Sequence, residues 1–287
     1  VDSAASTSQT ECAVGTYQAS TGQSSCLDAD AGHYVDSTGS GSQTECEVGT
    51  YNPYYGSSSS SDCLETDDGY YVSETGSPNQ IPCSPGTYQN QTGQSSCIGA
   101  DRGYFTPSYA SVIATPCAPG SYQSEVGQIS CELASPGYYV ELSASTYQTE
   151  CEPGRYQEGD GAMICLESDF GHYVPEYGSN YQTECAVGTY QDNRGQDMCI
   201  DAYPGFFVNA TGSDYQIACM IGTYNPIFGA SNISFCLESD EGYFTDYDGA
   251  ESQYECEPGT YQNQTGQTEC MEAGIGYYTN TSASINQ

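Results

Sequence analysis

Sixteen regularly spaced cysteines are the residues of this 287-residue sequence best suited to chemistry. They form eight pairs whose members lie 14 residues apart, or 17 in the second and seventh pairs, and the segment between successive pairs has a constant length. Thiols bind zinc, act as nucleophiles or form disulfides. Zinc sites usually need closely spaced cysteines or histidines, but no two cysteines here are closer than 14 residues and the chain has 2 histidines. We therefore expect disulfides, which indicate an extracellular compartment, secreted or at the cell surface.

The cysteine pairs mark a tandem repeat of 34 or 37 residues in which other positions keep the same phase. Each first cysteine is followed by Gly after three residues, by Tyr after five and by another Gly after ten. Each second cysteine is followed by Gly after six residues and by Tyr or Phe after eight. Glycine at a fixed phase predicts positive φ or a close backbone approach. The expected segments are a partial repeat at 1–11 and repeats at 12–45, 46–82, 83–116, 117–150, 151–184, 185–218, 219–255 and 256–287, the last truncated.

Short aromatic pieces such as G-T-Y-Q and G-Y-Y-V, bounded by Gly, Asn, Ser and Pro, predict strands of three to five residues joined by turns. No 3.6-residue period is sustained, so we expect little or no helix. The two fixed rings are almost the only large apolar groups of a repeat, and we expect them to be buried in a ladder. The predicted fold is mostly β: small disulfide-rich tandem repeats forming an elongated, solenoid-like rod of short β-hairpins.

The net charge of −35 arises from 38 acidic residues against three arginines. A field of this sign repels nucleic acid and anionic membranes, so neither is an expected partner. The sequence has no apolar run of roughly 18 residues, the length at which a membrane-spanning helix becomes a candidate, and we expect no membrane insertion of this segment. The sequence begins and ends within a repeat, which suggests a length cut from a longer array.

Acidic clusters after the second cysteines raise the possibility of calcium binding. They comprise Asp28/Asp30, Glu65/Asp67/Asp68, Glu167/Asp169 and Glu238/Asp240/Glu241. Their spacing is not that of an EF-hand loop and several repeats lack them, so a solvated acidic face is the preferred interpretation and no metal site is assigned. His33 and His172 stand where the other repeats carry Tyr or Phe, and no nucleophile–base arrangement accompanies them. We expect no enzymatic activity, no catalytic residues and no cofactor.

Five N-x-S/T sequons are candidate acceptors of N-linked glycans on surface loops. They begin at Asn90, Asn209, Asn232, Asn263 and Asn280. Asn90 and Asn263 lie at the same phase of a longer period described below. Chance occurrence in a chain rich in Asn, Ser and Thr is the alternative.

The motif C-x-P-G-T-Y, followed by G-Q-S-S-C and a second Gly-Tyr half, is clearest at Cys83 and is similar at Cys117, Cys151 and Cys256. It resembles the ephrin-receptor-like cysteine-rich repeats, relatives of the TNF-receptor modules, and the resemblance covers the whole chain. Those repeats usually place another cysteine at the start of the second half, and here it is missing. The resemblance implies that each first half closes as a ring, whereas bridges across the segments between pairs, from Cys26 to Cys46 onward, are the alternative. The implied pairs are Cys12–Cys26, Cys46–Cys63, Cys83–Cys97, Cys117–Cys131, Cys151–Cys165, Cys185–Cys199, Cys219–Cys236 and Cys256–Cys270.

A second period, five repeats long, lies above the first and relates Cys12 to Cys185 and Cys46 to Cys219. The sequence G-T-Y-N-P that begins at residue 49 recurs at residue 222, and the two long repeats are likewise separated by this period. A polymer that presents one contact at regular intervals accounts for such a period better than a receptor that reads one ligand. Arrays of this kind resemble extracellular rods and protist surface filaments such as mastigonemes. We expect a structural filament subunit whose partners are copies of itself and glycans; the alternative is a receptor or adhesin ectodomain.

The long repeats place apolar pairs at the phase where the short repeats are polar. These are Tyr54 and Tyr55 in one repeat and Ile227 and Phe228 in the other. Apolar side chains at the loop tips of an acidic rod are costly to leave in water, so we expect them to make the contacts between copies. The alternative is that each tip folds back on its own repeat, and the sequon at Asn232 in the same loop weighs against close packing.

Overall fold

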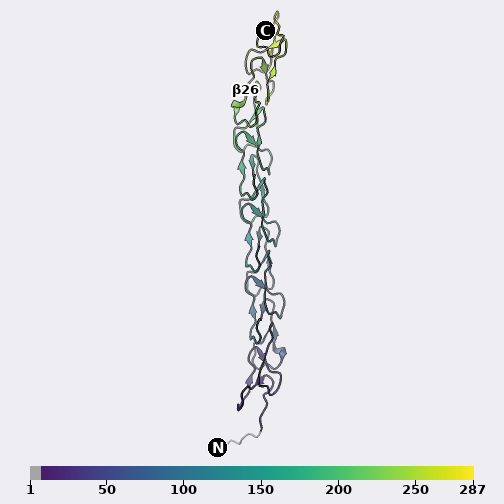
Figure 1. Cartoon of the computed structure of the whole chain (residues 1–287), viewed down its shortest axis with the longest axis vertical. Helices are drawn as coiled ribbons and strands as arrows, with labels where there is room; N and C mark the ends of the chain where they lie inside the picture. The colour runs from purple at the N-terminus through teal and green to yellow at the C-terminus, as the bar shows by residue number, and fades with distance from the viewer. Residues whose placement is uncertain (1–7) are drawn as a thin grey trace. The chain divides into compact units, whose positions relative to one another are not determined.

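The computed structural model describes residues 8–287, and its regular structure consists almost entirely of β-hairpins. Within the described residues, 15 pairs of two-residue antiparallel strands follow one another in chain order (Figure 1). Two 3₁₀ turns, η1 (Ser60–Asp62) and η2 (Ile233–Phe235), are the helical elements of this part of the chain. The predicted class, mostly β with almost no helix and one disulfide in each tandem repeat, is confirmed.

Each of the first seven repeats contributes one hairpin from its first half and one from its second half, and the eighth repeat contributes a first-half hairpin. The first-half hairpins are β1 (Thr16–Tyr17) with β2 (Leu27–Asp28), β5 (Thr50–Tyr51) with β6 (Leu64–Glu65), β9 (Thr87–Tyr88) with β10 (Ile98–Gly99), β13 (Ser121–Tyr122) with β14 (Glu132–Leu133), β17 (Arg155–Tyr156) with β18 (Leu166–Glu167), β21 (Thr189–Tyr190) with β22 (Ile200–Asp201), β25 (Thr223–Tyr224) with β26 (Leu237–Glu238), and β29 (Thr260–Tyr261) with β30 (Met271–Glu272). The second-half hairpins are β3 (His33–Tyr34) with β4 (Thr44–Glu45), β7 (Tyr70–Tyr71) with β8 (Ile81–Pro82), β11 (Tyr104–Phe105) with β12 (Thr115–Pro116), β15 (Tyr138–Tyr139) with β16 (Thr149–Glu150), β19 (His172–Tyr173) with β20 (Thr183–Glu184), β23 (Phe206–Phe207) with β24 (Ile217–Ala218), and β27 (Tyr243–Phe244) with β28 (Tyr254–Glu255).

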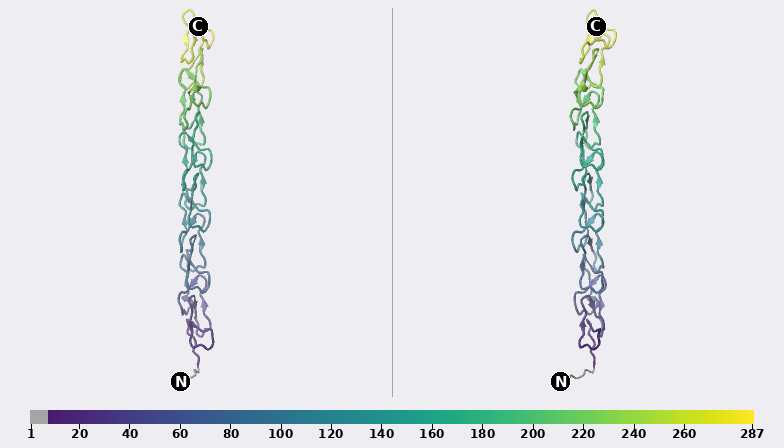
Figure 2. Two further views of the ribbon diagram at one scale, coloured as in Figure 1. Left: turned by 90° about the vertical axis from the view of Figure 1, so that its left-hand side faces the viewer. Right: turned by 60° about the vertical axis from the view of Figure 1, so that its left-hand side comes forward.

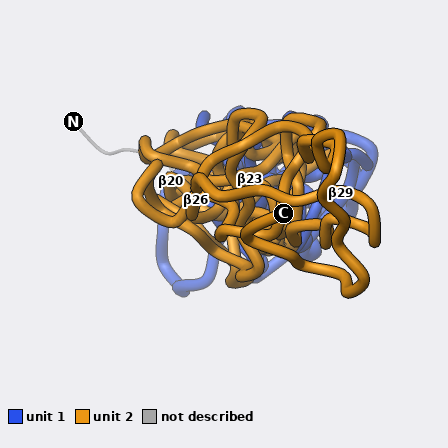
Figure 3. Tube along the Cα trace, turned by 90° about the horizontal axis from the view of Figure 1, so that it is seen from above, with its two compact units in different colours: residues 1–133, 142–147 blue, residues 134–141, 148–287 orange. Residues whose placement is uncertain are grey.

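The chain divides into two compact units, coloured separately in Figure 3. Unit 1 extends to Leu133 and also includes Leu142–Tyr147; unit 2 comprises Ala134–Glu141 and Gln148–Gln287. Within each unit, successive hairpins lie one after another, as the two views of Figure 2 also show.

Turn glycines hold the hairpins of each unit in contact. In unit 1, Gly32 has φ +84°, and a Cβ there would lie 2.0 Å from the carbonyl oxygen of Gly76, at the tip of the hairpin two further on. In unit 2, a Cβ on Gly171 would lie 1.9 Å from the carbonyl oxygen of Gly212. Real Cβ atoms do not approach backbone so closely, and positive φ is itself costly for other residues. These contacts explain why glycine recurs at this phase.

Because the backbones touch, the interior accepts mainly small side chains. The first cysteine of every pair is buried, together with Ala29, Ala100, Ala134 and Ala202, and with valines such as Val72 and Val174. Among the fixed rings, only Tyr156, Tyr190 and Phe207 are buried; the others are half-buried, and the last, Tyr278, is exposed. The prediction that the fixed rings are the buried members is therefore wrong for most of them. No ring contact in the described part of the chain joins two fixed rings, so a ladder is not formed either.

Buried amides complete the first-half hairpins. The Gln89 Nε2 donates to the carbonyl oxygen of Ser96 at 2.8 Å, and its Oε1 accepts from the backbone N–H of Gln91 at 3.2 Å. Gln123, Gln191 and Gln262 make the same two bonds. These side-chain bonds satisfy backbone groups that a longer ladder would pair. The strands are therefore two residues long, shorter than the predicted three to five.

Candidate assembly surface and disulfide framework

Every cysteine of the chain belongs to a disulfide that closes a first-half hairpin. Across the described residues no cysteine is free, and no bridge joins Cys26 to Cys46. The Cα atoms of bridged cysteines lie 5.5 to 5.8 Å apart, the usual range for a disulfide. The bridges are Cys12–Cys26, Cys46–Cys63, Cys83–Cys97, Cys117–Cys131, Cys151–Cys165, Cys185–Cys199, Cys219–Cys236 and Cys256–Cys270.

The second-half hairpins are closed by glutamine instead of cysteine. Ala29 and Gln43 stand in the second half at the positions that Cys12 and Cys26 occupy in the first, at the same separation along the chain. Gln43 Oε1 accepts from the backbone N–H of Asp30 at 2.7 Å, and Gln43 Nε2 donates to Asp30 Oδ2 at 2.8 Å. We call the hydrogen bond that the glutamine Oε1 accepts from this backbone N–H the amide clamp. It closes the half in which the cysteine of the resembled repeats is missing.

The amide clamp recurs in seven of the eight second halves. Gln80, Gln182 and Gln253 bind both the backbone N–H and the carboxylate of an aspartate. Gln148, Gln216 and Gln287 accept from a backbone N–H. In the third repeat the position is Ala114, and no clamp forms. Sequence reasoning missed this hydrogen bond, although its signal, a Gln three residues before the first cysteine of a pair, is visible in the sequence.

The loop tips of the two long repeats are built alike. Asn52 and Asn225 are fully buried where the short repeats have Gln, and each accepts the backbone N–H of the residue two further on. Each also donates to the backbone of the preceding hairpin, Asn52 to His33 O at 3.1 Å and Asn225 to Phe206 O at 2.9 Å. The three extra residues form η1 and η2, directly before the second cysteine.

The apolar pairs at these tips point into solvent. Tyr54 and Tyr55 are 65% and 71% exposed, and Ile227 and Phe228 are 43% and 62% exposed. Phe228 makes an edge contact with Tyr203, with 6.0 Å between the ring centroids. Most of each pair's surface is thus available to a second molecule.

All five sequon asparagines are exposed. Asn232 is the N-cap of η2, where its Oδ1 accepts from the backbone N–H of Ser234 at 2.9 Å. Attachment of a glycan to Nδ2 leaves this acceptor in place. Asn90, Asn209, Asn263 and Asn280 lie outside the two-residue strands.

The acidic residues are spread over the surface, and no group of three or more potential metal ligands occurs among the described residues. Two arginines pair with them, Arg155 with Glu167 at 2.7 Å and Arg194 with Asp169 at 3.4 Å. His33 and His172 lie on β3 and β19, with Nδ1 facing the carbonyl oxygens of Ala31 and Phe170. The structure therefore places both histidines in hairpins and brings neither to a nucleophile.

Several phenols have pKa values above the ordinary range. Burial is the main cause of the raised pKa at Tyr156, Tyr190 and Tyr224. At Tyr138, the hydroxyl donates to Glu150 Oε1 at 3.1 Å, and this bond raises its pKa. The folded state favours the neutral phenol. The contribution of each such tyrosine to stability is therefore complete below its unfolded-state pKa and is lost as the pH rises through its folded-state pKa.

In the part of the chain that the structure describes, no helix is long and apolar enough to cross a membrane. The disulfides indicate an extracellular protein. Residues 3–46 match the sequence family described as tyrosine-protein kinase ephrin type A/B receptor-like. No curated protein matches the chain. The matched family points to a non-catalytic extracellular repeat region, and with its eight disulfide-linked tandem repeats the chain is a cysteine-rich repeat protein that is ephrin-receptor-like at residues 3–46.

Proposed function

We propose that this chain is a structural subunit of a secreted filament or surface fibre, comparable to protist mastigonemes and built from copies of itself. The observation that carries the proposal is the recurrence of one exposed apolar tip at the same phase of the five-repeat period. A contact that returns at a fixed interval suits a polymer, since an open and repeating interface generates fibres rather than closed rings.

The tips have the properties of association surfaces. Tyr54 is 65% exposed and Phe228 is 62% exposed, although their loops are fixed by fully buried asparagines. Ordered loops lose little conformational freedom on binding, and exposed aromatic side chains gain from removal of water. We propose that Tyr54, Tyr55, Ile227 and Phe228 contact neighbouring copies.

The remaining surface suits a glycoprotein exposed to water. Five exposed sequons offer sites for N-linked glycans, and the net charge of −35 opposes non-specific aggregation. A fibre subunit of this kind associates through a few apolar contacts, although its copies repel one another through their negative charge. Added salt therefore strengthens association by screening the repulsion between chains.

Electron microscopy of the oxidised chain tests this proposal. In the test variant, Tyr54, Tyr55, Ile227 and Phe228 are all replaced by Ser. The control replaces four side chains outside the tips that are 65 to 70% exposed, Leu142, Tyr147, Tyr177 and Tyr181, by Ser. We expect fibres from the wild type and the control but not from the tip variant.

Other outcomes separate the parts of the proposal. Fibres of unchanged spacing from the tip variant would show that the tips are not the contact. Monodisperse single chains of the wild type at all salt concentrations would instead favour the receptor or adhesin ectodomain.

A further inference from the structure

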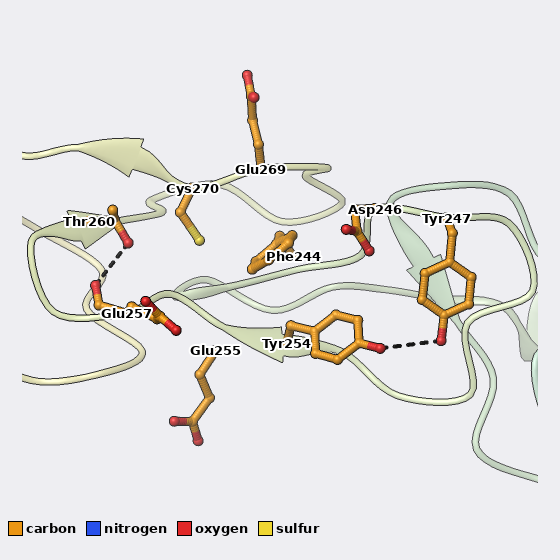
Figure 4. Close-up of a pocket in the computed structure, with 9 residues that line it drawn as sticks. All are labelled: Phe244, Asp246, Tyr247, Tyr254, Glu255, Glu257, Thr260, Glu269 and Cys270. Carbon is orange, nitrogen blue, oxygen red and sulfur yellow. Dashed lines mark hydrogen bonds between the residues drawn. The ribbon is translucent and has the colours of Figure 1, made fainter.

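A hollow in unit 2 combines aromatic rings with carboxylates. It has a volume of about 700 Å³ and lies along β27, β28 and the following hairpin. Three of its lining residues are aromatic, Phe244, Tyr247 and Tyr254, and Figure 4 shows the Tyr247 and Tyr254 hydroxyls directed toward each other. Four more carry carboxylates: Asp246, Glu255, Glu257 and Glu269. We call these seven residues the aromatic groove.

The aromatic groove has the chemistry of a cation site. The ring centroids of Phe244 and Tyr254 lie 5.8 Å apart, and those of Tyr247 and Tyr254 lie 6.3 Å apart. None of the ion pairs of the described residues involves its four carboxylates. Aromatic faces attract cations, and a planar guanidinium both stacks on rings and donates to carboxylates.

The chain already recognises one guanidinium in this manner. Arg194 lies 5.2 Å from the centroid of the Phe170 ring, and its Nη2 is 3.4 Å from Asp169 Oδ1. A ring and a neighbouring carboxylate thus contact an arginine together at the surface of this protein. The aromatic groove offers three rings for the same purpose, and of its four carboxylates those of Glu255 and Glu269 point away from the rings in Figure 4.

Arg102 is the one arginine of the chain that has no such partner. Arg155 and Arg194 are paired within the chain, whereas Arg102 is exposed and makes no ion pair or ring contact with any residue in the range 8–287. Since the sequence contains three cations in total, Arg102 is the one available to another molecule.

The surroundings of Arg102 favour the approach of an acidic surface. Between Glu74 and Glu125, the only charged residues are Asp101 and Arg102, so this segment carries no net charge in a chain of −35. It also exposes apolar side chains, Tyr109 at 67% and Ile113 at 68%. The segment itself therefore adds no net like-charge repulsion against an acidic surface of a second copy.

We propose that Arg102 of one copy binds in the aromatic groove of a second copy. The inference rests on the proposed function, and it names a contact distinct from the loop tips. The two surfaces differ, so the contact is heterologous and leaves a free Arg102 at one end and a free groove at the other. Head-to-tail addition of further copies follows.

Sedimentation velocity tests this contact on the full oxidised chain in 0.15 M salt. N-glycans are removed first, because Asn90 lies in the same segment as Arg102. Arg102→Ala is compared with Arg194→Ala, which changes the net charge equally but removes an arginine held within its own chain. We expect Arg102→Ala and Tyr254→Ala each to weaken self-association by about tenfold or more, and Arg194→Ala to leave it unchanged. Mixing Arg102→Glu chains with Glu257→Arg chains should restore association that each variant alone has lost.

Each remaining outcome has a definite meaning. Equal association of the Arg102→Ala and Arg194→Ala chains overturns this contact and leaves the filament function standing. Loss with Tyr254→Ala but not with Arg102→Ala also overturns it, because a different group then occupies the groove. A wild-type chain that stays monomeric contradicts the filament function and this contact together.

Discussion

The two hairpins of a repeat reach the same geometry by different chemistry. In β1–β2, Thr16 pairs with Asp28, and in β3–β4, His33 pairs with Glu45, so both pairings join residues at the same separation along the chain. The first hairpin is closed by a disulfide and the second by the amide clamp of Gln43. Covalent closure is therefore not what shapes the hairpin. Turn glycines and side-chain amides set its shape, and the disulfide adds stability by restricting the unfolded chain.

One second-half hairpin has neither a disulfide nor an amide clamp. In β11–β12, Ala114 replaces the clamping glutamine, and Ala110 takes φ +53° where most other repeats use glycine. The Thr106 hydroxyl is buried without a hydrogen-bond partner, at a phase where five other repeats have a buried valine. An unsatisfied buried hydroxyl and a strained alanine both destabilise the folded state. We infer that this hairpin is the weakest of unit 1.

Loss of a disulfide should have the largest effect. Replacing Cys83 and Cys97 together by Ser opens a ring of about 15 residues, which costs about 3 kcal/mol in the chain-entropy model. Native-state hydrogen exchange should show this loss at β9–β10 and leave β1–β2 unchanged, because the backbone hydrogen bonds join each hairpin to those near it along the chain. A uniform loss of protection across unit 1 would show that its hairpins unfold together.

Loss of a clamp should have a smaller effect. Gln182→Ala removes the bonds to the backbone N–H and carboxylate of Asp169, and should cost β19–β20 about 1 kcal/mol of local stability. The control is Gln23→Ala, because Gln23 is exposed in a loop tip. Hydrogen exchange at His172 and Tyr173 reports the change. Equal effects of the two variants would mean that the clamp does not close the hairpin.

The smallest effect is expected from repair of the weakest hairpin. Thr106→Val removes the orphan hydroxyl and reproduces the buried Val140 of the next repeat, so it should stabilise β11–β12 by about 1 kcal/mol. Val140→Thr is the matched reverse substitution and should destabilise β15–β16. An unchanged stability in both variants, measured by exchange at Tyr104 and Tyr138, would show that a hydroxyl at this phase finds a partner in solution.

The sequence predicts much of this architecture because its repeats can be compared with one another. Constant cysteine spacing and short Gly-bounded aromatic pieces indicate disulfide-rich hairpins with almost no helix, and the structure confirms that class. The spacing does not show that the backbone at Gly32 touches Gly76. Such close backbone contacts leave room in the interior for few rings, and most buried side chains are Cys, Ala, Val and amides. The clamp was missed because glutamine is normally a surface residue, and its role appears only when Gln43 is aligned with Cys26.

Electron microscopy of the protein purified from its natural source tests the filament function most directly. Immunogold labelling with an antibody against the 75–124 segment identifies the chain in the images. The account predicts long fibres with gold at regular axial intervals; because P-G-T-Y-Q-N-Q-T-G-Q occurs at both 85–94 and 258–267, the antibody is first depleted of binding to that shared peptide so that it labels each copy once. Isolated, monodisperse particles, or labelling of cell surfaces without fibres, would contradict it.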